Sequence, residues 1–599
     1  MTSISFLNYL NERYIKLHSE YEEAFWDFRM GITKDGVRMN KGEIARDAFR
    51  SDKNLKNEVE GYIKKSKGEI KRRLQIWDNF FSLFQIPDEA IPIRKKVTEI
   101  EERMLKVHAT RKEGYLFNGE FVEASRNKMR TMMRTHPDET IRKACFEAVE
   151  KLPLETLADY VEVIKYRNEY ARILGYADFY DYKIHLDEGI TKNQLFSIFD
   201  KIYEKTKYAF KNIRDLENSK PGLRKPWNFG YMMTGDFTKE EDPYFQFENV
   251  IDLWGRSFSA LGIDYRGGKL KLDLLDRKGK WDNGFCHYPE IVHYDKKGKM
   301  KPGSSNFTST AIPSQIGSGI LGINTVFHEA GHAADRLNSI QKDACINTEY
   351  PPSTVSWAET HSMFMDSISS SVEWRVRYAK NANNEAYPFD IYERKLKALY
   401  PLLPLEMMHI NFVIDFEKQI YECKNLTEEF VLDTARKVNK KYFDYSEDSI
   451  SILNVPHIYS WESSAYYHGY GLAELGVCQW RDYFYKKYGY IVDNPKVGQE
   501  MTKVWKLGSL YKSGQFIKIA TGKKLSANAF IKSVTRPIDK IIKITKQRVA
   551  RLAKVPQYKK HIKLNAHITM VHGEEKITDS AEGFENMAEK YKKWIISKK

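Results

Sequence analysis

The chain has 599 residues, of which 42% are hydrophobic and 13% aromatic, so its composition excludes an intrinsically disordered protein. A chain of this length is expected to fold into two or three lobes. The formal net charge is +15, but no arginine-rich tract interleaved with aromatic residues is present, and we expect no nucleic-acid partner.

The five cysteines are far apart and form no C-x-x-C pair, which argues against a disulfide framework or a cysteine-built zinc site. The first residues lack the apolar stretch of a signal peptide, and no later segment is apolar enough to span a bilayer. We therefore expect a cytoplasmic protein with no membrane partner.

Helical periodicity covers residues from about 4 to 210, and it predicts an amino-terminal helical lobe over residues 1–135. The clearest amphipathic stretches in this part are 17–29, 91–107, 139–150 and 157–174. We expect a catalytic region over 136–550 to follow, with a small β region at about 264–311. A basic, helical tail is predicted over 551–599.

The β region contains alternating segments that are typical of short strands and a hairpin. They are Lys269–Leu274, Ile291–Tyr294 and Asn306–Thr308. A glycine-rich connection from Gly317 to Gly322 then leads into a helical run, and helical periodicity continues from 354 to about 550. Within it, segment 536–563 is strongly basic with Asp539 as its single acid; we interpret it as a solvated helix face rather than a docking surface.

A metal-binding pattern stands in this helical run, between Val326 and Asp335. His328 and His332 lie one helical turn apart on one face, where two imidazoles can bind a single ion. Glu329 sits beside this face and can reach a metal-bound water as general base. The sequence therefore predicts one zinc ion per chain.

A third ligand is expected from the next helical segment, where Glu359 follows His332 after 27 residues, enough for a loop and a returning helix. Asp366 lies two turns further along the same face and can accept a hydrogen bond from a ligand imidazole. His361 is the competing ligand, although it points roughly away from the face of Glu359.

These residues resemble the thimet oligopeptidase and oligoendopeptidase F family of metallopeptidases. Phe327 to His332 match the family's F-H-E-x-G-H helix, and Glu359, Ser362 and Asp366 match E-x-x-S-x-x-x-E with Asp in place of the final Glu. Further similar segments extend the resemblance over roughly 140 to 535. They are Tyr166–Tyr176, Asp273–Lys280, Gly284–Cys286 and Thr521–Phe530.

The family also has a histidine followed by closely spaced tyrosines, which is matched here by His457 and by Tyr467 and Tyr470. Phenol and imidazole donors stabilise a tetrahedral oxyanion without carrying a competing negative charge. The resemblance leaves open which tyrosine donates; we favour Tyr467, with Tyr470 and His457 assisting.

The resemblance implies a mainly α, elongated body of two lobes around a deep substrate channel, with the small β region beside the zinc helix. It also implies oligopeptide substrates, and we expect a monomer or weak dimer. Asn306, Phe307, Tyr459 and Tyr466 are the expected substrate-binding residues, and the strand around Asn306 is expected to pair with the peptide backbone.

Three hypotheses follow for the function. The first is a zinc-dependent endopeptidase that cleaves internal bonds of short unfolded oligopeptides. The second is a dipeptidyl carboxypeptidase, since related zinc peptidases share this metal triad. The third is a non-catalytic protein with structural zinc that binds peptide or nucleic acid, and the presence of all four core residues argues against it.

Overall fold

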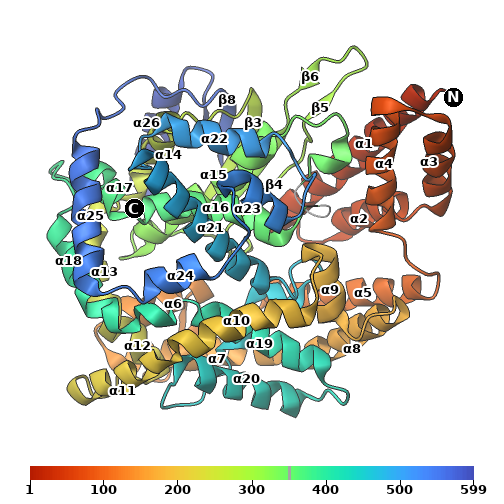
Figure 1. Cartoon of the computed structure of the whole chain (residues 1–599). Helices are drawn as coiled ribbons and strands as arrows, with labels where there is room; N and C mark the ends of the chain where they lie inside the picture. Colours follow the sequence, from red (N-terminus) through yellow and green to blue (C-terminus); the bar gives the residue numbers. More distant parts are fainter. Residues whose placement is uncertain (349–352, 599) are drawn as a thin grey trace.

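The first four helices pack around a hydrophobic core that also takes in Ile291 and residues 344–346 from later in the chain (Figure 1). The computed structural model describes residues 1–348 and 353–598. These helices are α1 (Ser3–Arg29), α2 (Val37–Arg50), α3 (Lys53–Lys65) and α4 (Gly68–Ser82). Most of the described residues lie in helices, and the sheets are few and small, which confirms the predicted mainly α fold.

A second hydrophobic core joins two helical segments that are distant in sequence (lower part of Figure 1). Its main helices are α5 (Ala90–Thr110), α8 (Leu157–Ile173), α9 (Phe179–Glu188), α10 (Lys192–Thr206), α11 (Phe210–Ser219), α19 (Met408–Glu422) and α20 (Glu428–Phe443). Because α5 packs with α8, the cores separate after α4 and not at the predicted boundary of residue 135.

The third and largest core holds the main sheet and the helices that carry the metal-binding pattern. The pattern lies on α15 (Ser318–Asn338) and α16 (Val355–Ser369), and the other main helices of this core are α14 (Val250–Ala260), α17 (Val372–Tyr378), α22 (Pro495–Trp505), α23 (Ser513–Thr521) and α26 (Phe584–Lys598). Helix α21 (Tyr467–Tyr488) connects the two large cores, since Leu472 and Leu475 pack in the second and Val477 and Trp480 in the third.

Smaller elements surround these cores. They are the hairpin β1 (Gly114–Phe117) and β2 (Glu120–Glu123), α6 (Arg126–Thr135), α7 (Glu139–Lys151), α12 (Pro226–Gly230), α13 (Asp236–Glu241), α18 (Phe389–Leu399), α24 (Asn528–Val534) and α25 (Ile538–Ala553). The hairpin was not predicted. Helix α25 carries the basic segment and buries Ile542 and Leu552, while most of its lysines and arginines remain partly or fully exposed.

The main sheet has the strand order β4-β7-β3-β8-β9. Its strands are β4 (Phe285–His287), β7 (Ser304–Ala311), β3 (Gly268–Leu275), β8 (Ala566–His572) and β9 (Glu575–Asp579). Strand β3 runs parallel to β7 and β8, whereas β4 and β9 are antiparallel to their neighbours. The predicted hairpin is the pair β5 (His293–Tyr294) and β6 (Met300–Lys301).

Strand β7 cannot take up a substrate strand, so this prediction is wrong. Both edges of β7 are already paired, because Phe307 lies opposite Cys286 on β4 and opposite Leu272 on β3. The side chain of Phe307 is fully buried against Trp254, and Asn306 is buried as well. Within the described residues β4 is the strand at this end of the sheet, and edge strands are where extended peptides add.

The carboxy-terminal segment is not the helical tail that the sequence predicted. After α25 the chain returns to the sheet, where β8 pairs with β3 along six residues and β9 pairs with β8; only α26 is helical. Met570 of β8 and Met587 of α26 are fully buried in the third core. This segment therefore completes the layer that supports the metal-binding helix.

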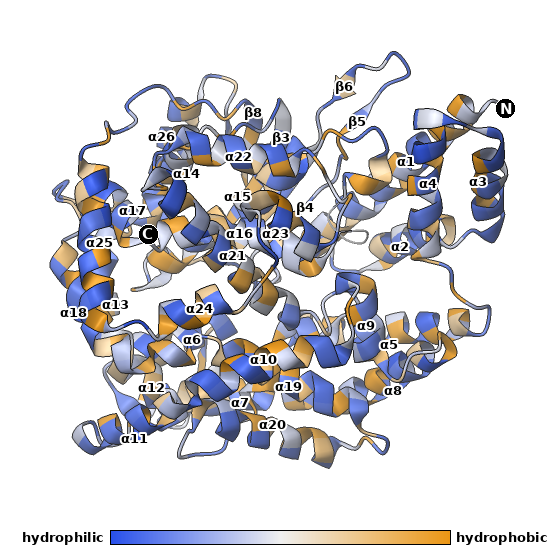
Figure 2. Ribbon diagram, in the orientation of Figure 1, coloured by the Kyte–Doolittle hydropathy of each residue, from blue (hydrophilic) through white to orange (hydrophobic). Residues whose placement is uncertain are grey.

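Figure 2 shows hydrophilic and hydrophobic residues alternating around the helices. No helix of the described residues is long and apolar enough to cross a membrane. All five cysteines are free, as their spacing predicted.

Candidate metal centre

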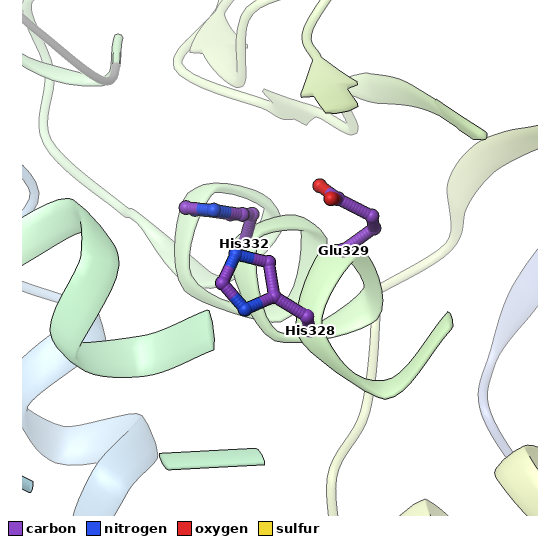
Figure 3. Close-up of side chains that lie close together, drawn as sticks. All are labelled: His328, Glu329 and His332. Carbon is purple, nitrogen blue, oxygen red and sulfur yellow. The ribbon is translucent and has the colours of Figure 1, made fainter. Parts of the chain in front are cut away.

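Helix α15 presents both histidines of the metal-binding pattern on one face. The ring centroids of His328 and His332 are 5.1 Å apart, and Figure 3 shows the rings side by side with the Glu329 carboxylate beside them. The ligand atoms of these three residues lie within 4.8 Å of one another. Local helix geometry alone accounts for this arrangement, because residues four apart meet after one turn.

Helix α16 brings a second carboxylate to the same two imidazoles. Glu359 Oε2 lies 3.3 Å from His328 Nε2 and 3.5 Å from His332 Nε2, and the residue is 3% exposed. Zinc at its usual bond lengths of about 2.0–2.1 Å holds tetrahedral ligands about 3.3 Å apart. Two imidazole nitrogens and one carboxylate oxygen at these separations fit a zinc ion.

Gly331 allows the two helices to approach closely enough for this contact. A Cβ at this position would lie 3.0 Å from His361 O, from Ser362 Cα and from Met365 Cγ, all on α16. The sequence had indicated that Gly331 reduces bulk beside the ion, but the space it leaves is filled by the backbone of α16. The glycine thus sets the distance between the helices, at a cost in helix propensity.

Hydrogen bonds orient the ligand side chains. His328 Nδ1 lies 2.9 Å from Asp366 Oδ2, and donation of its proton leaves Nε2 as the metal-facing atom. Ser362 Oγ donates to Glu359 Oε2 at 3.0 Å, and the Tyr466 hydroxyl donates to Glu359 Oε1. Aspartate at position 366 is therefore long enough to reach the imidazole, although the family pattern has glutamate there.

The electrostatics of the centre favour positive charge. Burial lowers the pKa of His328, but hydrogen bonds to Asp366 and Glu359 outweigh it and raise the pKa to about 10. Burial raises the pKa of Glu359, but the neighbouring His332 and His328 hold it well below its usual range. A buried site that keeps Glu359 ionised and stabilises cationic charge is suited to a divalent metal.

His361 is not part of this centre. Its Nδ1 accepts a hydrogen bond from Trp505 Nε1 at 2.7 Å, and its Nε2 lies 3.4 Å from Asp335. The side chain is fully buried, and burial holds its pKa well below the usual range. The alternative ligand therefore faces the third core, as its position on the helix predicted.

Glu329 lies between the metal-binding face and the edge strand. A Cβ on Gly284, the residue before β4, would lie 3.0 Å from Glu329 Oε1 and 2.5 Å from Thr325 Cγ2. The carboxylate is therefore packed directly under the start of the edge strand, where an added peptide would lie. The sequence showed Gly284 only as part of a resembling segment, and its contact with the candidate base was not predicted.

The predicted donor cluster is assembled beside Glu359. His457 Nε2 lies 3.1 Å from the Tyr470 hydroxyl, and the rings of His457 and Tyr467 have centroids 5.0 Å apart. Burial lowers the pKa of His457 to about 4 and raises that of Tyr467 to about 12, and the charge of Glu359 acts on both. Both groups are therefore neutral hydrogen-bond donors at neutral pH.

Two other tyrosines, Tyr459 and Tyr466, were predicted to bind substrate. The Tyr459 hydroxyl donates to Leu453 O at 2.6 Å, and its ring packs in the second core against Tyr160 and His108, so it is not available to substrate. Tyr466 is buried; its hydroxyl donates to Glu359, and its ring lies against those of His457 and Tyr470, with centroids 5.6 Å and 5.2 Å apart. A single sequence carries no signal that separates these tyrosines from Tyr467 and Tyr470.

Comparison with protein families gives a match to Peptidase family M3 over residues 132–536. This chain belongs to that family. Members are zinc metallopeptidases, so the chain is a zinc metallopeptidase with peptide substrates, and the family resemblance seen in the sequence is confirmed. The match covers α7 through α24 and thus contains every predicted site residue.

Among solved structures, the peptidase is similar to an M32 carboxypeptidase from Deinococcus radiodurans R1, with a TM-score of 0.59 and 15% sequence identity. The similarity covers 90% of this chain and 100% of the carboxypeptidase, and at this identity it shows a shared fold. A search of curated proteins returned no match.

The contact between His328 and Asp366 predicts the effect of one substitution in this peptidase. Asp366→Asn should lower zinc affinity about 10–100-fold, because the amide orients and polarises the imidazole less well than the carboxylate does. Competition with a zinc chelator measures this directly. Unchanged affinity in Asp366→Asn would show that the contact does not tune the site.

Proposed function

We propose that the chain is an endopeptidase that binds one zinc ion and hydrolyses internal bonds of short, unfolded oligopeptides. The observation that carries the catalytic part is the position of Glu359 Oε2, 3.3 Å and 3.5 Å from the two imidazoles, with Glu329 on the helix that carries both histidines. His328, His332 and Glu359 would hold the zinc, which supplies a Lewis acid that polarises the peptide carbonyl and acidifies water.

The protein's own groups supply the proton transfers and the charge stabilisation. Glu329 accepts the proton of the attacking water and then delivers it to the leaving amine. Tyr467 donates a hydrogen bond to the developing oxyanion, assisted by Tyr470 and His457. His457 fits this role because its Nδ1 is buried and has no hydrogen-bond partner among the described residues.

Internal cleavage is supported by the edge strand β4. A peptide that pairs with β4 is held through its backbone on both sides of the scissile bond, so neither terminus has to be gripped. The start of this strand lies against Glu329, so a peptide paired there would lie next to the proposed base. Backbone pairing also requires an extended, unfolded substrate.

Peptides blocked at both ends test this proposal. We expect acetylated and amidated peptides to be cut internally by the zinc-loaded enzyme, as mass spectrometry of the products would show. If blocked peptides resist cleavage while free peptides lose carboxy-terminal dipeptides, the alternative of a dipeptidyl carboxypeptidase is correct.

A further inference from the structure

A cavity of about 490 Å³ lies beside the candidate active site, between α6 and α12 on one side and α15 and β7 on the other. Two arginines of α6, Arg130 and Arg134, line it together with Asn127 and Gln315. Ile316 in the preceding loop and Leu321, which lines the cavity, are more than 40% exposed. The cavity therefore combines cationic, amide and apolar surface, as peptide-binding sites do.

Two contacts join this cavity to the candidate catalytic groups. Thr325 lines the cavity one helical turn before Glu329, and its methyl group is the one that approaches Gly284. Arg130 lies close enough to Tyr467 for its charge to lower the pKa of the phenol, against the stronger effect of burial. A substrate that reaches from Tyr467 and Glu329 along α15 therefore enters the cavity.

Neither arginine forms an ion pair with a carboxylate among the residues that the structure describes. The neighbouring Arg126 pairs with Asp282, whose charge also acts on Arg130 from a greater distance. Arg130 donates one hydrogen bond, to Asn454 O at 3.0 Å, which leaves most of its five N–H groups available. Burial lowers the pKa of Arg130 to about 10 and that of Arg134 below its usual range.

The stem of Arg134 is held in place. A Cβ on Gly230 of α12 would lie 3.0 Å from Arg134 Cγ, so α12 packs directly on the side chain. A desolvated guanidinium with a packed stem and no carboxylate beside it favours an anion, and a planar carboxylate can bind it through two parallel hydrogen bonds.

The strand directions indicate which part of a peptide meets these arginines. Strand β4 runs antiparallel to β7, and the cavity is lined by Thr310 and Ile312 at the end of β7, so it lies beyond the start of β4. A peptide that adds antiparallel to β4 has its carboxy-terminal part at that end. Two cations there also repel a terminal ammonium group, which favours the same direction.

We propose that Arg130 and Arg134 form a subsite for a carboxylate on the carboxy-terminal side of the scissile bond. The group is either the terminal carboxylate of the peptide or the side chain of Asp or Glu.

The distance from Glu329 indicates which residue of the substrate reaches the subsite. The cavity follows α15 from Ser318 to Thr325, which puts it about 6–16 Å from Glu329 along the helix. At about 3.3 Å per residue, this corresponds to about two to five residues beyond the cut. The subsite rests on the proposed peptidase function and adds to it a preference for substrates with a carboxylate at this distance from the cut.

Four matched peptides test the subsite with the zinc-loaded Glu329→Gln protein, in which binding is measured without turnover. Two differ only in a free or amidated carboxy terminus, and two amidated peptides differ only in Glu or Gln at the third position beyond the expected cut. In one of the two pairs, we expect the peptide with the carboxylate to bind about 10-fold more tightly than the matched neutral peptide. A difference in the first pair assigns the subsite to the terminal carboxylate, and a difference in the second pair assigns it to an acidic side chain.

Arg134→Gln in the same protein should bring that ratio close to one, and Arg134→Lys should restore part of it. Lys128→Gln is the matched control, because it removes a charge from an exposed position of the same helix and should leave the ratio unchanged. A ratio of one before substitution, or a ratio that Arg134→Gln leaves unchanged in a folded protein, would overturn the subsite. Failure of the enzyme with intact Glu329 to cut any peptide, with the binding ratio preserved, would refute the function and leave the subsite standing.

Discussion

Glu329→Gln should reduce peptide hydrolysis by at least about 10²–10⁴-fold while the protein keeps its zinc. The amide retains the size of the side chain but cannot accept the proton of the attacking water, and general base catalysis contributes about that factor. The substitution leaves His328, His332 and Glu359 in place, so metal content should stay near one ion per chain. Initial rates on a fluorogenic peptide and elemental analysis of the same sample provide the two measurements.

The control for this experiment is a substitution that removes a carboxylate elsewhere. Glu428→Gln, at the exposed start of α20, should leave both the rate and the zinc content unchanged. Hydrolysis by Glu329→Gln at a rate close to that of the unsubstituted protein would remove Glu329 from the mechanism.

Glu359→Ala should abolish stoichiometric zinc binding, and hydrolysis should be lost with the metal. Substitutions of groups that only orient a ligand typically cost about 10–100-fold in metal affinity, so loss of a ligand itself should exceed this. The change also leaves two imidazoles without the buried carboxylate that balances a divalent charge. Zinc content after dialysis against a weak chelator provides the measurement.

Comparison of the two glutamate variants identifies the third ligand. A Glu329 oxygen also lies within 4.8 Å of the imidazole nitrogens, so distance to the histidines alone does not exclude it as a ligand. If Glu359→Ala kept its zinc and Glu329→Gln lost it, the two roles would be exchanged. We expect the opposite, since Glu359 has the shorter contacts and hydrogen bonds from Ser362 and Tyr466 that orient it.

The residues predicted well from the sequence are those whose arrangement depends on one helix. His328 and His332 meet because they are four residues apart, and Glu359 and Asp366 share a face because they are seven apart. The two helices must also pack together, which the sequence indicated through the 27-residue spacing from His332 to Glu359 and through the family resemblance. The structure adds the reason, which is the close approach at Gly331.

The predictions that were wrong depended on partners that are distant in sequence. The pattern of Asn306–Thr308 predicted a strand correctly, but its place between β4 and β3 depends on pairing with residues 285–287 and 268–275. Tyr459 stands in the same tyrosine-rich segment as Tyr467, yet its hydroxyl donates to the backbone carbonyl of Leu453 and its ring packs in the second core.

The sequence by itself determined the mainly helical fold, the candidate ligands and the candidate base of this peptidase, because helical periodicity and ligand spacing are local properties. Only the tertiary structure decided which strand lies at the edge, how the carboxy-terminal strands complete the sheet, and which arginines line the cavity. These features arise when elements up to about 300 residues apart pack together. The free energy of that packing depends on both partners at once, so it cannot be inferred from the sequence of either segment alone.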